Sequence, residues 1–269
     1  MLQALISDLP MLFAQTVLVA LQDIKILWPS GIEPHIEIIL RWIHFIAGIT
    51  WIGHLYFFNF VNANMMKALD GPTKGKVTPQ LMPRALWWFR WGAALTVLAG
   101  VIYFIIILHS EPNTWPTFFK WLIVVLVTFV IIYGLLQPLS GALNNGWIIA
   151  CIVALLMIIM AIALLQLIGG EGLTRAGITQ PPSNRALSIA IGGGMGVIMM
   201  LNVWGIIWPH QKRIIAWTYD NAEKDTEIPA ESAKLARRAF LASRMNTWLS
   251  IPMLFFMGAA NHYTLFVNK

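Results

Sequence analysis

Long apolar runs constrain the fold of this chain more than any other feature of its sequence. A transmembrane α-helix needs about 20 predominantly apolar residues to cross a hydrocarbon core about 30 Å thick. Five segments meet this requirement: 36–61, 84–108, 116–136, 146–168 and 185–208. A sixth, 245–267, contains Pro252, which bundled membrane helices tolerate because neighbouring groups satisfy the freed backbone carbonyl. We therefore predict an all-α, polytopic membrane bundle of about six or seven transmembrane helices.

The charge content excludes several other classes of protein. Only 11% of the residues are charged, against about 25% in an ordinary soluble domain, so the chain is expected to contact the lipid bilayer. The net charge of +6 comes from basic residues in two loops rather than on a continuous face, which argues against nucleic acid as a partner. Cys151 is the single cysteine, which excludes disulfides and cysteine-ligated metal centres within the chain.

The distribution of basic residues predicts the orientation in the membrane. Loop 62–84 carries four Lys or Arg residues and loop 209–244 carries seven, whereas loops 109–115 and 169–184 together hold only Arg175. The positive-inside rule places the two basic loops in the cytoplasm, so the C-terminus lies outside. After Pro229, the basic residues Lys234, Arg237 and Arg238 share one helical face. They predict an amphipathic helix, either on the anionic leaflet or in solvent.

The chain is expected to form a single membrane domain over residues 1–269, with the transmembrane bundle at 36–267. Its N-terminal part, 1–30, is less regular, because Asp8 and Pro10 interrupt the apolar stretch 2–21. That stretch is interpreted as a short span or as a helix lying on the membrane surface.

Histidines inside the apolar segments are the best candidates for chemistry, because ionisable groups at membrane depth usually face the interior of a bundle. On a helix, Arg41, Gly48 and Trp51 share the face of His44 to within about 60°. An imidazole beside a glycine, a cation and an indole suits a haem iron ligand, with room for the ring and a charge for its propionates. His54 lies about 15 Å deeper, so it cannot serve the same iron.

His262 lies at nearly the same predicted depth as His44, on the last segment. The two imidazoles are therefore candidate axial ligands of one haem b near the outer leaflet. The alternative is a pair of unrelated buried histidines, hydrogen-bonded to the backbone or to Asn246 and Asn261. His54 is a weaker metal-ligand candidate, for a separate site on the inner side.

Several stretches, in order along the chain, resemble the bacterial membrane-bound urate oxidase family. The first is Arg41-Trp42-Ile43-His44-Phe45-Ile46-Ala47-Gly48-Ile49-Thr50-Trp51-Ile52-Gly53. The others are Trp88-Phe89-Arg90-Trp91-Gly92, Asn202-Val203-Trp204, Trp208-Pro209-His210-Gln211-Lys212-Arg213, Asn246, Ile251-Pro252-Met253 and Asn261-His262-Tyr263.

The resemblance implies an oxidoreductase in the bacterial inner membrane that oxidises urate to 5-hydroxyisourate. Arg41 and Trp51 would be catalytic, and His44, Gly48 and His262 would bind the cofactor. Members of the family commonly carry a cytochrome c domain after the membrane domain. These 269 residues contain no such domain, so a separate cytochrome c is the expected electron acceptor. A different class stays open: a non-catalytic, haem b-bearing subunit that has other subunits of a respiratory or photosynthetic complex as its partners.

Overall fold

The computed structural model describes residues 10–17, 27–111, 113–138, 141–169, 173–175, 178–180 and 182–266. The chain divides into two compact units, Met1–Ile38 and Ile39–Lys269, and each is described by itself. In the first unit, residues 10–17 form an exposed helix, and the His35 ring lies 3.2 Å from the Pro29 carbonyl oxygen. The predicted element at 2–21 lies largely outside the described residues, so its relation to the membrane stays a prediction.

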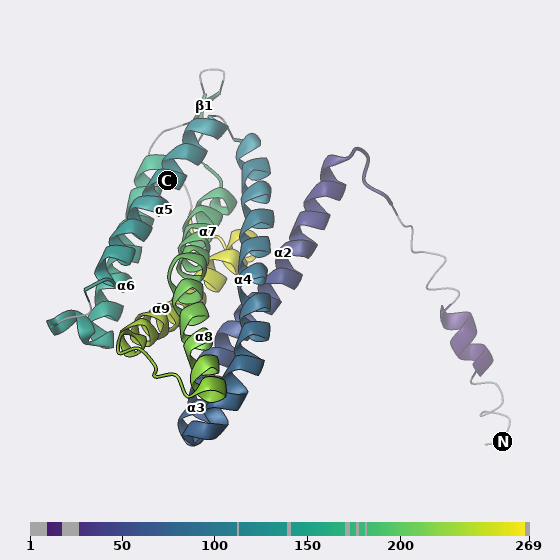
Figure 1. The fold of residues 1–269 in the computed structure, drawn as a ribbon. Coiled ribbons are helices and arrows are strands. Elements are labelled where there is room, and N and C mark those ends of the chain that lie inside the picture. Colours follow the sequence, from purple (N-terminus) through teal and green to yellow (C-terminus); the bar gives the residue numbers. More distant parts are fainter. Residues whose placement is uncertain are drawn as a thin grey trace. The chain divides into compact units, whose positions relative to one another are not determined.

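The second unit is a helical bundle (Figure 1). Its first half contains α2 (Glu33–Tyr56) from Ile39 onward, the π-helix η1 (Phe57–Asn62), α3 (Ala63–Ala68), α4 (Gly71–His109) and α5 (Thr114–Leu135). A short 3₁₀-helix, η2 (Gly141–Asn144), leads into α6 (Gly146–Leu164) and the π-helix η3 (Leu165–Gly169). Strands β1 (Leu173–Arg175) and β2 (Ile178–Gln180) pair antiparallel, with Thr174 opposite Thr179. The last elements are α7 (Asn184–Asn202), the π-helix η4 (Val203–Ile207), α8 (Trp208–Lys224) and α9 (Glu231–His262).

Helix α7 lies in the middle of the bundle and contacts α4, α5, α6 and α9 (Figure 1). Its small residues allow this, because a Cβ added to Gly192 would lie only 2.9 Å from Met257 and Phe256 of α9. A Cβ on Gly194 would lie 3.0 Å from Val125 of α5. The glycine-rich run in α7 therefore lets neighbouring helices approach closely, as in other membrane bundles.

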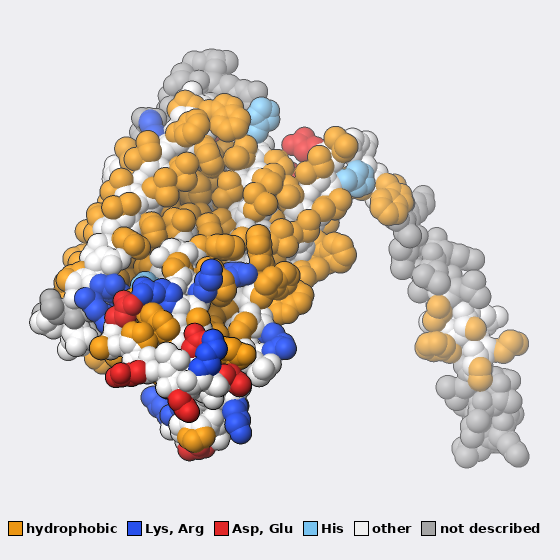
Figure 2. All heavy atoms as spheres, viewed as in Figure 1, with side chains coloured by type: hydrophobic (Ala, Val, Ile, Leu, Met, Phe, Trp, Pro, Cys, Tyr) orange, Lys and Arg blue, Asp and Glu red, His pale blue; other side chains and the backbone are white. Residues whose placement is uncertain are grey.

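The surface of the bundle is suited to lipid. Figure 2 shows a broad hydrophobic belt, with Lys and Arg gathered at the end of the bundle where α3 and α8 lie. Among the described residues, five helical segments are long and apolar enough to cross a membrane: Glu33–Ala68, Gly71–His109, Thr114–Leu135, Gly146–Ile168 and Asn184–Lys224. The predicted helical membrane bundle is confirmed, and the five spans match the five predicted apolar segments to within one residue or extend beyond them.

Residues 245–262 of the sixth predicted span form the second half of α9, which ends at His262, and this helix is not among those five. The reason is a row of polar residues that faces the other helices rather than lipid. Tyr56 Oη lies 2.9 Å from Ser250 Oγ, and Asn59 donates to Ser243 Oγ at 2.8 Å. Ser250 is fully buried, so these polar groups lower the apolar character of α9 without exposing it to lipid.

The two basic loops proved to be mostly helical. In 62–84, α3 ends at Ala68 and α4 begins at Gly71, after Asp70 accepts a hydrogen bond from the Thr73 backbone. In 209–244, α8 runs to Lys224 and α9 begins at Glu231. The helix predicted after Pro229 is present, and its residues form the first turns of α9. Arg237 donates to the Asn144 carbonyl at 2.8 Å, and Arg238 donates to the Gln137 carbonyl, so both bind the end of the α5–α6 connection.

Candidate functional site

The candidate site is built on the face of α2 that meets α4. Trp51 and Leu55 on this face are buried, and Arg41, His44 and Gly48 are half-buried. On the opposite side, Trp42 and Ile49 are 65% and 74% exposed, as expected for side chains in lipid. The predicted inward face of α2 is therefore confirmed.

His44 is held in one orientation by α4. Its Nδ1 lies 2.8 Å from the carbonyl oxygen of Thr96, and the ring packs against Gly100. A carbonyl oxygen only accepts hydrogen bonds, so Nδ1 is the protonated nitrogen, and Nε2 of the neutral ring carries a lone pair. Backbone bonding of one ring nitrogen is how proteins commonly orient a histidine that binds a metal or accepts a proton through the other.

One helical turn from this imidazole, two arginines meet on one tyrosine. Arg41 Nε donates to Tyr103 Oη at 2.6 Å, and an Arg185 amino group donates to the same oxygen. The guanidinium carbons of Arg41 and Arg185 also lie 5.0 and 5.2 Å from the centre of the Tyr103 ring. Three helices, α2, α4 and α7, thus bring two cations and a phenol together beside His44.

Such a cluster favours a small planar anion. Guanidinium groups donate in a fixed fork that suits carboxylate-like and imide-like oxygens, and both cations are partly removed from water, which strengthens their attraction for an anion. Tyr103 accepts from both arginines and keeps its own hydroxyl proton as a donor. The cluster therefore combines two cations with a phenol hydroxyl that can still donate.

Gly48 and Trp51 serve the packing of α2 on α4. A Cβ on Gly48 would lie 3.7 Å from Thr96 Cγ2, and one on Gly92 would lie 3.2 Å from the Trp51 backbone nitrogen. The space beside Gly48, predicted to receive a cofactor ring, thus contains the Thr96 side chain. The Trp51 ring is 1% exposed, and its Nε1 has no hydrogen-bond partner among the described residues. Its predicted catalytic role stays untested.

His262 lies elsewhere, in the last turn of α9, where it is exposed. The neighbouring backbone is held by Asn184, the first residue of α7. The Asn184 amide donates to the Tyr263 carbonyl at 3.3 Å, and its oxygen accepts from Leu265 N at 2.9 Å and Phe266 N at 3.1 Å. Asn184 therefore fixes the end of α9 at the level of the neighbouring Arg185.

These positions bear on the predicted haem b. His44 has the fixed tautomer that an axial ligand needs, with Nε2 available. The side chain beside Gly48 and the exposure of His262 do not fit a ring clasped between His44 and His262. Of the two predicted iron ligands, only His44 has surroundings that suit a haem.

The other histidine candidate has a local partner. Nδ1 of His54 lies 2.7 Å from the Thr50 carbonyl one turn earlier on α2. Among the described residues, no three His, Cys, Asp or Glu side chains gather in a way that could hold a metal ion. His54 therefore belongs to no group of three such ligands in the part of the chain that the structure describes, and its role as a metal ligand stays a prediction.

Several of the remaining stretches of the sequence resemblance contact one another. The guanidinium of Arg90 lies 3.8 Å from the centre of the Trp208 ring, and Trp204 Nε1 donates to the Arg90 carbonyl at 3.1 Å. Asn202 donates to Asn246 Oδ1 at 2.8 Å, and both side chains are fully buried. These residues therefore connect α4, α7, α8 and α9 through ring stacking and hydrogen bonds.

Two members of the arginine–tyrosine cluster were not predicted from the sequence. Tyr103 stands inside an apolar run, and Arg185 stands at the start of the segment 185–208, where a lone cation resembles an ordinary flanking charge. The signal available for Tyr103 was a phenol at membrane depth, since its hydroxyl needs a partner. The pairing itself depends on which helices touch, and spacing along the chain does not determine that.

The comparison with known families matches this chain over most of its length. A sequence model of the family described as "Urate oxidase N-terminal" matches residues 70–269. His44 and Arg41 precede that region, whereas Tyr103, Arg185 and His262 lie within it. No curated protein and no solved structure matches the chain.

Proposed function

Because the chain belongs to the urate oxidase N-terminal family, we propose that it is a membrane redox protein that oxidises urate or a closely related donor. Its electrons pass to a separate cytochrome c. The observation that carries this proposal is the meeting of Arg41 and Arg185 on Tyr103, next to the oriented imidazole of His44. Urate is a planar anion at neutral pH, rimmed by carbonyl and imide groups, and the cluster offers complementary charge and donors.

The proposed reaction is a two-electron oxidation. Urate and one water give 5-hydroxyisourate, two protons and two electrons, and two ferric cytochrome c molecules take one electron each. The oxygen of the water forms a bond to carbon 5 of the purine, while that ring system loses the two electrons. His44 Nε2 is the group placed to accept one of the protons, since its Nδ1 is committed to the Thr96 carbonyl. Arg41 and Arg185 stabilise the negative charge of the bound substrate.

The orientation is part of the proposal. With the basic ends of α3, α4 and α8 in the cytoplasm, the arginine–tyrosine cluster lies on the outer side of the membrane. There it would meet a soluble cytochrome c of the periplasm. Labelling of cysteines introduced at the exposed positions Asn144 and His109 in a Cys151→Ala background tests the two sides independently of activity.

A direct assay tests the function. Purified protein in lipid vesicles should reduce added ferric cytochrome c when urate is supplied. Arg41→Gln or Arg185→Gln should lower kcat/KM for urate about ten- to a hundredfold, the effect of one lost charge-assisted hydrogen bond. Arg213→Gln is the matched control, because Arg213 pairs with Glu231 on the other side of the bundle and should leave the rate unchanged. Absence of urate-dependent reduction by folded protein would refute the proposal.

A reduced-minus-oxidised spectrum of the same protein tests the haem prediction separately. Loss of a bis-histidine spectrum in both the His44 and the His262 variants would support that pair of ligands, and an unchanged spectrum in both variants would exclude it. A haem that urate does not reduce would instead favour the alternative function, a non-catalytic haem-bearing subunit of a larger electron-transfer complex.

A further inference from the structure

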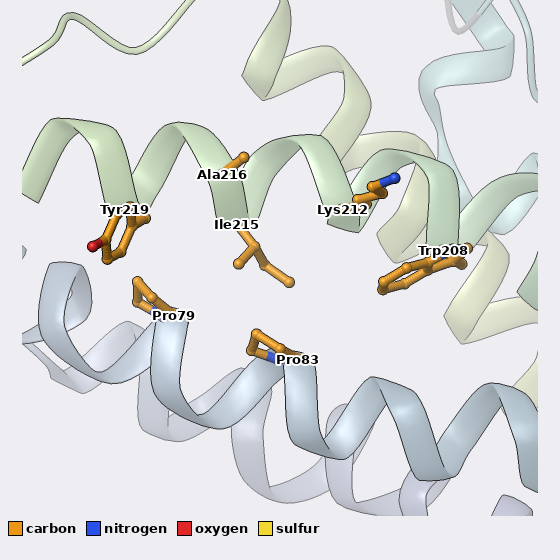
Figure 3. A pocket seen from close by; sticks show the side chains of 7 residues that line it. All are labelled: Pro79, Pro83, Trp208, Lys212, Ile215, Ala216 and Tyr219. Atoms are coloured by element: carbon orange, nitrogen blue, oxygen red, sulfur yellow. The ribbon is translucent and has the colours of Figure 1, made fainter.

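A groove lies between α4 and α8, at the end of the bundle where the basic residues gather (Figures 2 and 3). The two helices touch on both sides of it. A Cβ on Gly75 would lie 3.2 Å from Ala222, and Arg90 stacks on Trp208 at 3.8 Å. Between these contacts the helices part and leave about 310 Å³. That volume is at the lower end of the roughly 300–1,000 Å³ of small-molecule sites and suits part of a long ligand.

The floor of the groove is apolar, and its polar groups are at the rim. Pro79 and Pro83 of α4 face Ile215 and Trp208 of α8 across the gap (Figure 3). Tyr219 lies at one end of the groove and is 47% exposed. Aromatic residues with one apolar and one polar side are typical of the level where acyl chains meet headgroups.

The two prolines also leave backbone acceptors without helical donors. Proline has no N–H, so the carbonyls of Gly75 and Pro79, four residues before Pro79 and Pro83, lose their usual partners in α4. One-turn spacing puts both carbonyls on the face that carries the proline rings. A ligand with hydroxyl groups would satisfy them.

Lys212 supplies the charge. It lies along the rim, is exposed, and has no hydrogen bond or ion pair recorded among the described residues. The neighbouring cation Arg213 is already paired with Glu231, and Lys224 is paired with Asp220 at 2.7 Å. Lys212 is thus the basic residue of α8 that lines the groove without a protein anion.

From these features we infer that the groove binds an anionic glycerophospholipid. One acyl chain lies on Pro79, Pro83 and Ile215, the phosphate lies at Lys212, and the headgroup hydroxyls face the proline-freed carbonyls. Charge complementarity selects this occupant over a neutral lipid, and the inference does not depend on the substrate proposed above. The site is independent of the arginine–tyrosine cluster, which lies at the opposite end of α4.

The test compares two lipids with the same acyl chains on the purified full-length protein in detergent. Phosphatidylglycerol should raise the temperature of unfolding in a saturable way, and phosphatidylcholine should raise it much less. Lys212→Ala should weaken the apparent affinity for phosphatidylglycerol about tenfold or more, as expected for a lost charge-assisted bond to phosphate. Lys234→Ala, an exposed lysine of α9 outside the groove, is the matched control and should not change it.

Three results would overturn the inference: equal stabilisation by the two lipids, an unchanged affinity in Lys212→Ala, or an equal loss in Lys234→Ala. Ile215→Trp gives a second measure, because its larger ring should occupy the groove and remove the difference between the lipids. If Ile215→Trp or Lys212→Ala instead changes the oligomeric state while neither lipid binds, the groove contacts a second copy of the chain and the lipid assignment is wrong.

Discussion

The buried pair of Asn202 and Asn246 provides a quantitative test of how the bundle is held together. Asn202 Nδ2 donates to Asn246 Oδ1 at 2.8 Å, and Asn246 Nδ2 donates to the Met199 carbonyl at 2.9 Å. Both side chains are fully buried, and Asn202 Oδ1 has no partner among the described residues. Removal of the Asn246 side chain therefore leaves both the nitrogen and the oxygen of the Asn202 amide without a hydrogen-bond partner among the described residues.

The magnitude follows from these contacts. Interhelical hydrogen bonds in membrane proteins couple by about 0.6 kcal/mol on average and about 1.7 kcal/mol at most, so the two lost bonds cost about 1 kcal/mol. An unsatisfied buried amide adds about 1–3 kcal/mol. Asn246→Ala should therefore lower the free energy of unfolding by about 2–4 kcal/mol. Asn202→Ala should lower the free energy of unfolding by less than Asn246→Ala does. It removes a single hydrogen-bond donor, Nδ2, together with Oδ1, which has no partner among the described residues.

The assay is equilibrium unfolding in mixed micelles, followed by tryptophan fluorescence, for the two single variants and the double variant. The double variant should be more stable than the sum of the single effects predicts, by about 1–2 kcal/mol, because it removes the orphaned amide as well. Asn144→Ala is the surface control and should change stability by less than about 0.5 kcal/mol. Strict additivity of the two single effects would refute the pairing as a source of stability.

Three further predictions concern other contacts. Gly100→Ala places a Cβ 2.9 Å from the His44 imidazole, so urate-dependent turnover should fall about ten- to a hundredfold. Gly134→Ala, whose Cβ would have nothing within 4 Å, should leave turnover unchanged, and equal effects of the two variants would contradict the packing argument. Asn184→Ala should lower the free energy of unfolding by about 1–3 kcal/mol and speed hydrogen exchange at the backbone amides of Leu265 and Phe266, which donate to the Asn184 oxygen. Unchanged exchange at these amides would show that other contacts hold the segment after α9. Hydrogen bonds from Thr73 lower the pKa of Asp70, so the stabilisation of α4 by the Asp70 carboxylate is complete above the ordinary aspartate pKa and is lost as the pH falls through the lowered pKa. The unfolding temperature of Asp70→Ala should lack this pH dependence, and parallel pH profiles of variant and wild type would refute the prediction.

The spans and the inward face of α2 were predictable from the sequence because both depend on local composition. An apolar run long enough to cross the membrane has few alternatives to a helix, since lipid cannot satisfy free backbone groups. The same holds for the side of α2 that carries His44 and Trp51, which is fixed by the helical period alone.

The helical continuation of the basic loops was predictable in part. Asp70 followed by a glycine and a proline is a strong start signal for a helix, and it marks the first turn of α4 in the structure. The charges that follow reduce the apolar score of the segment without reducing its tendency to form a helix. Apolar character therefore located the membrane-spanning part of each helix and missed its extension into water.

The partners in the site were beyond prediction from one sequence. His44 faces Thr96 and Gly100 because α2 crosses α4 where glycines allow close approach, and Arg185 reaches Tyr103 because α7 is central. These contacts depend on helix pairing, which local periodicity does not encode. The same reason explains why His44 and His262, placed at one depth by residue counting, have different surroundings in the structure.

The polar face of α9 has a consequence for the biosynthesis of the protein. A nascent segment that carries Asn246, Thr247 and Ser250 partitions poorly into a bilayer when it leaves the translocon alone. In the folded bundle Asn246 is hydrogen-bonded to α7, and Ser250 meets Tyr56 at the end of α2; both partners have already been synthesised when α9 emerges. Integration of α9 should thus be the last and most dependent step of assembly. Changes in α7 that leave its own insertion intact should then appear as a failure of the C-terminal helix to enter the membrane.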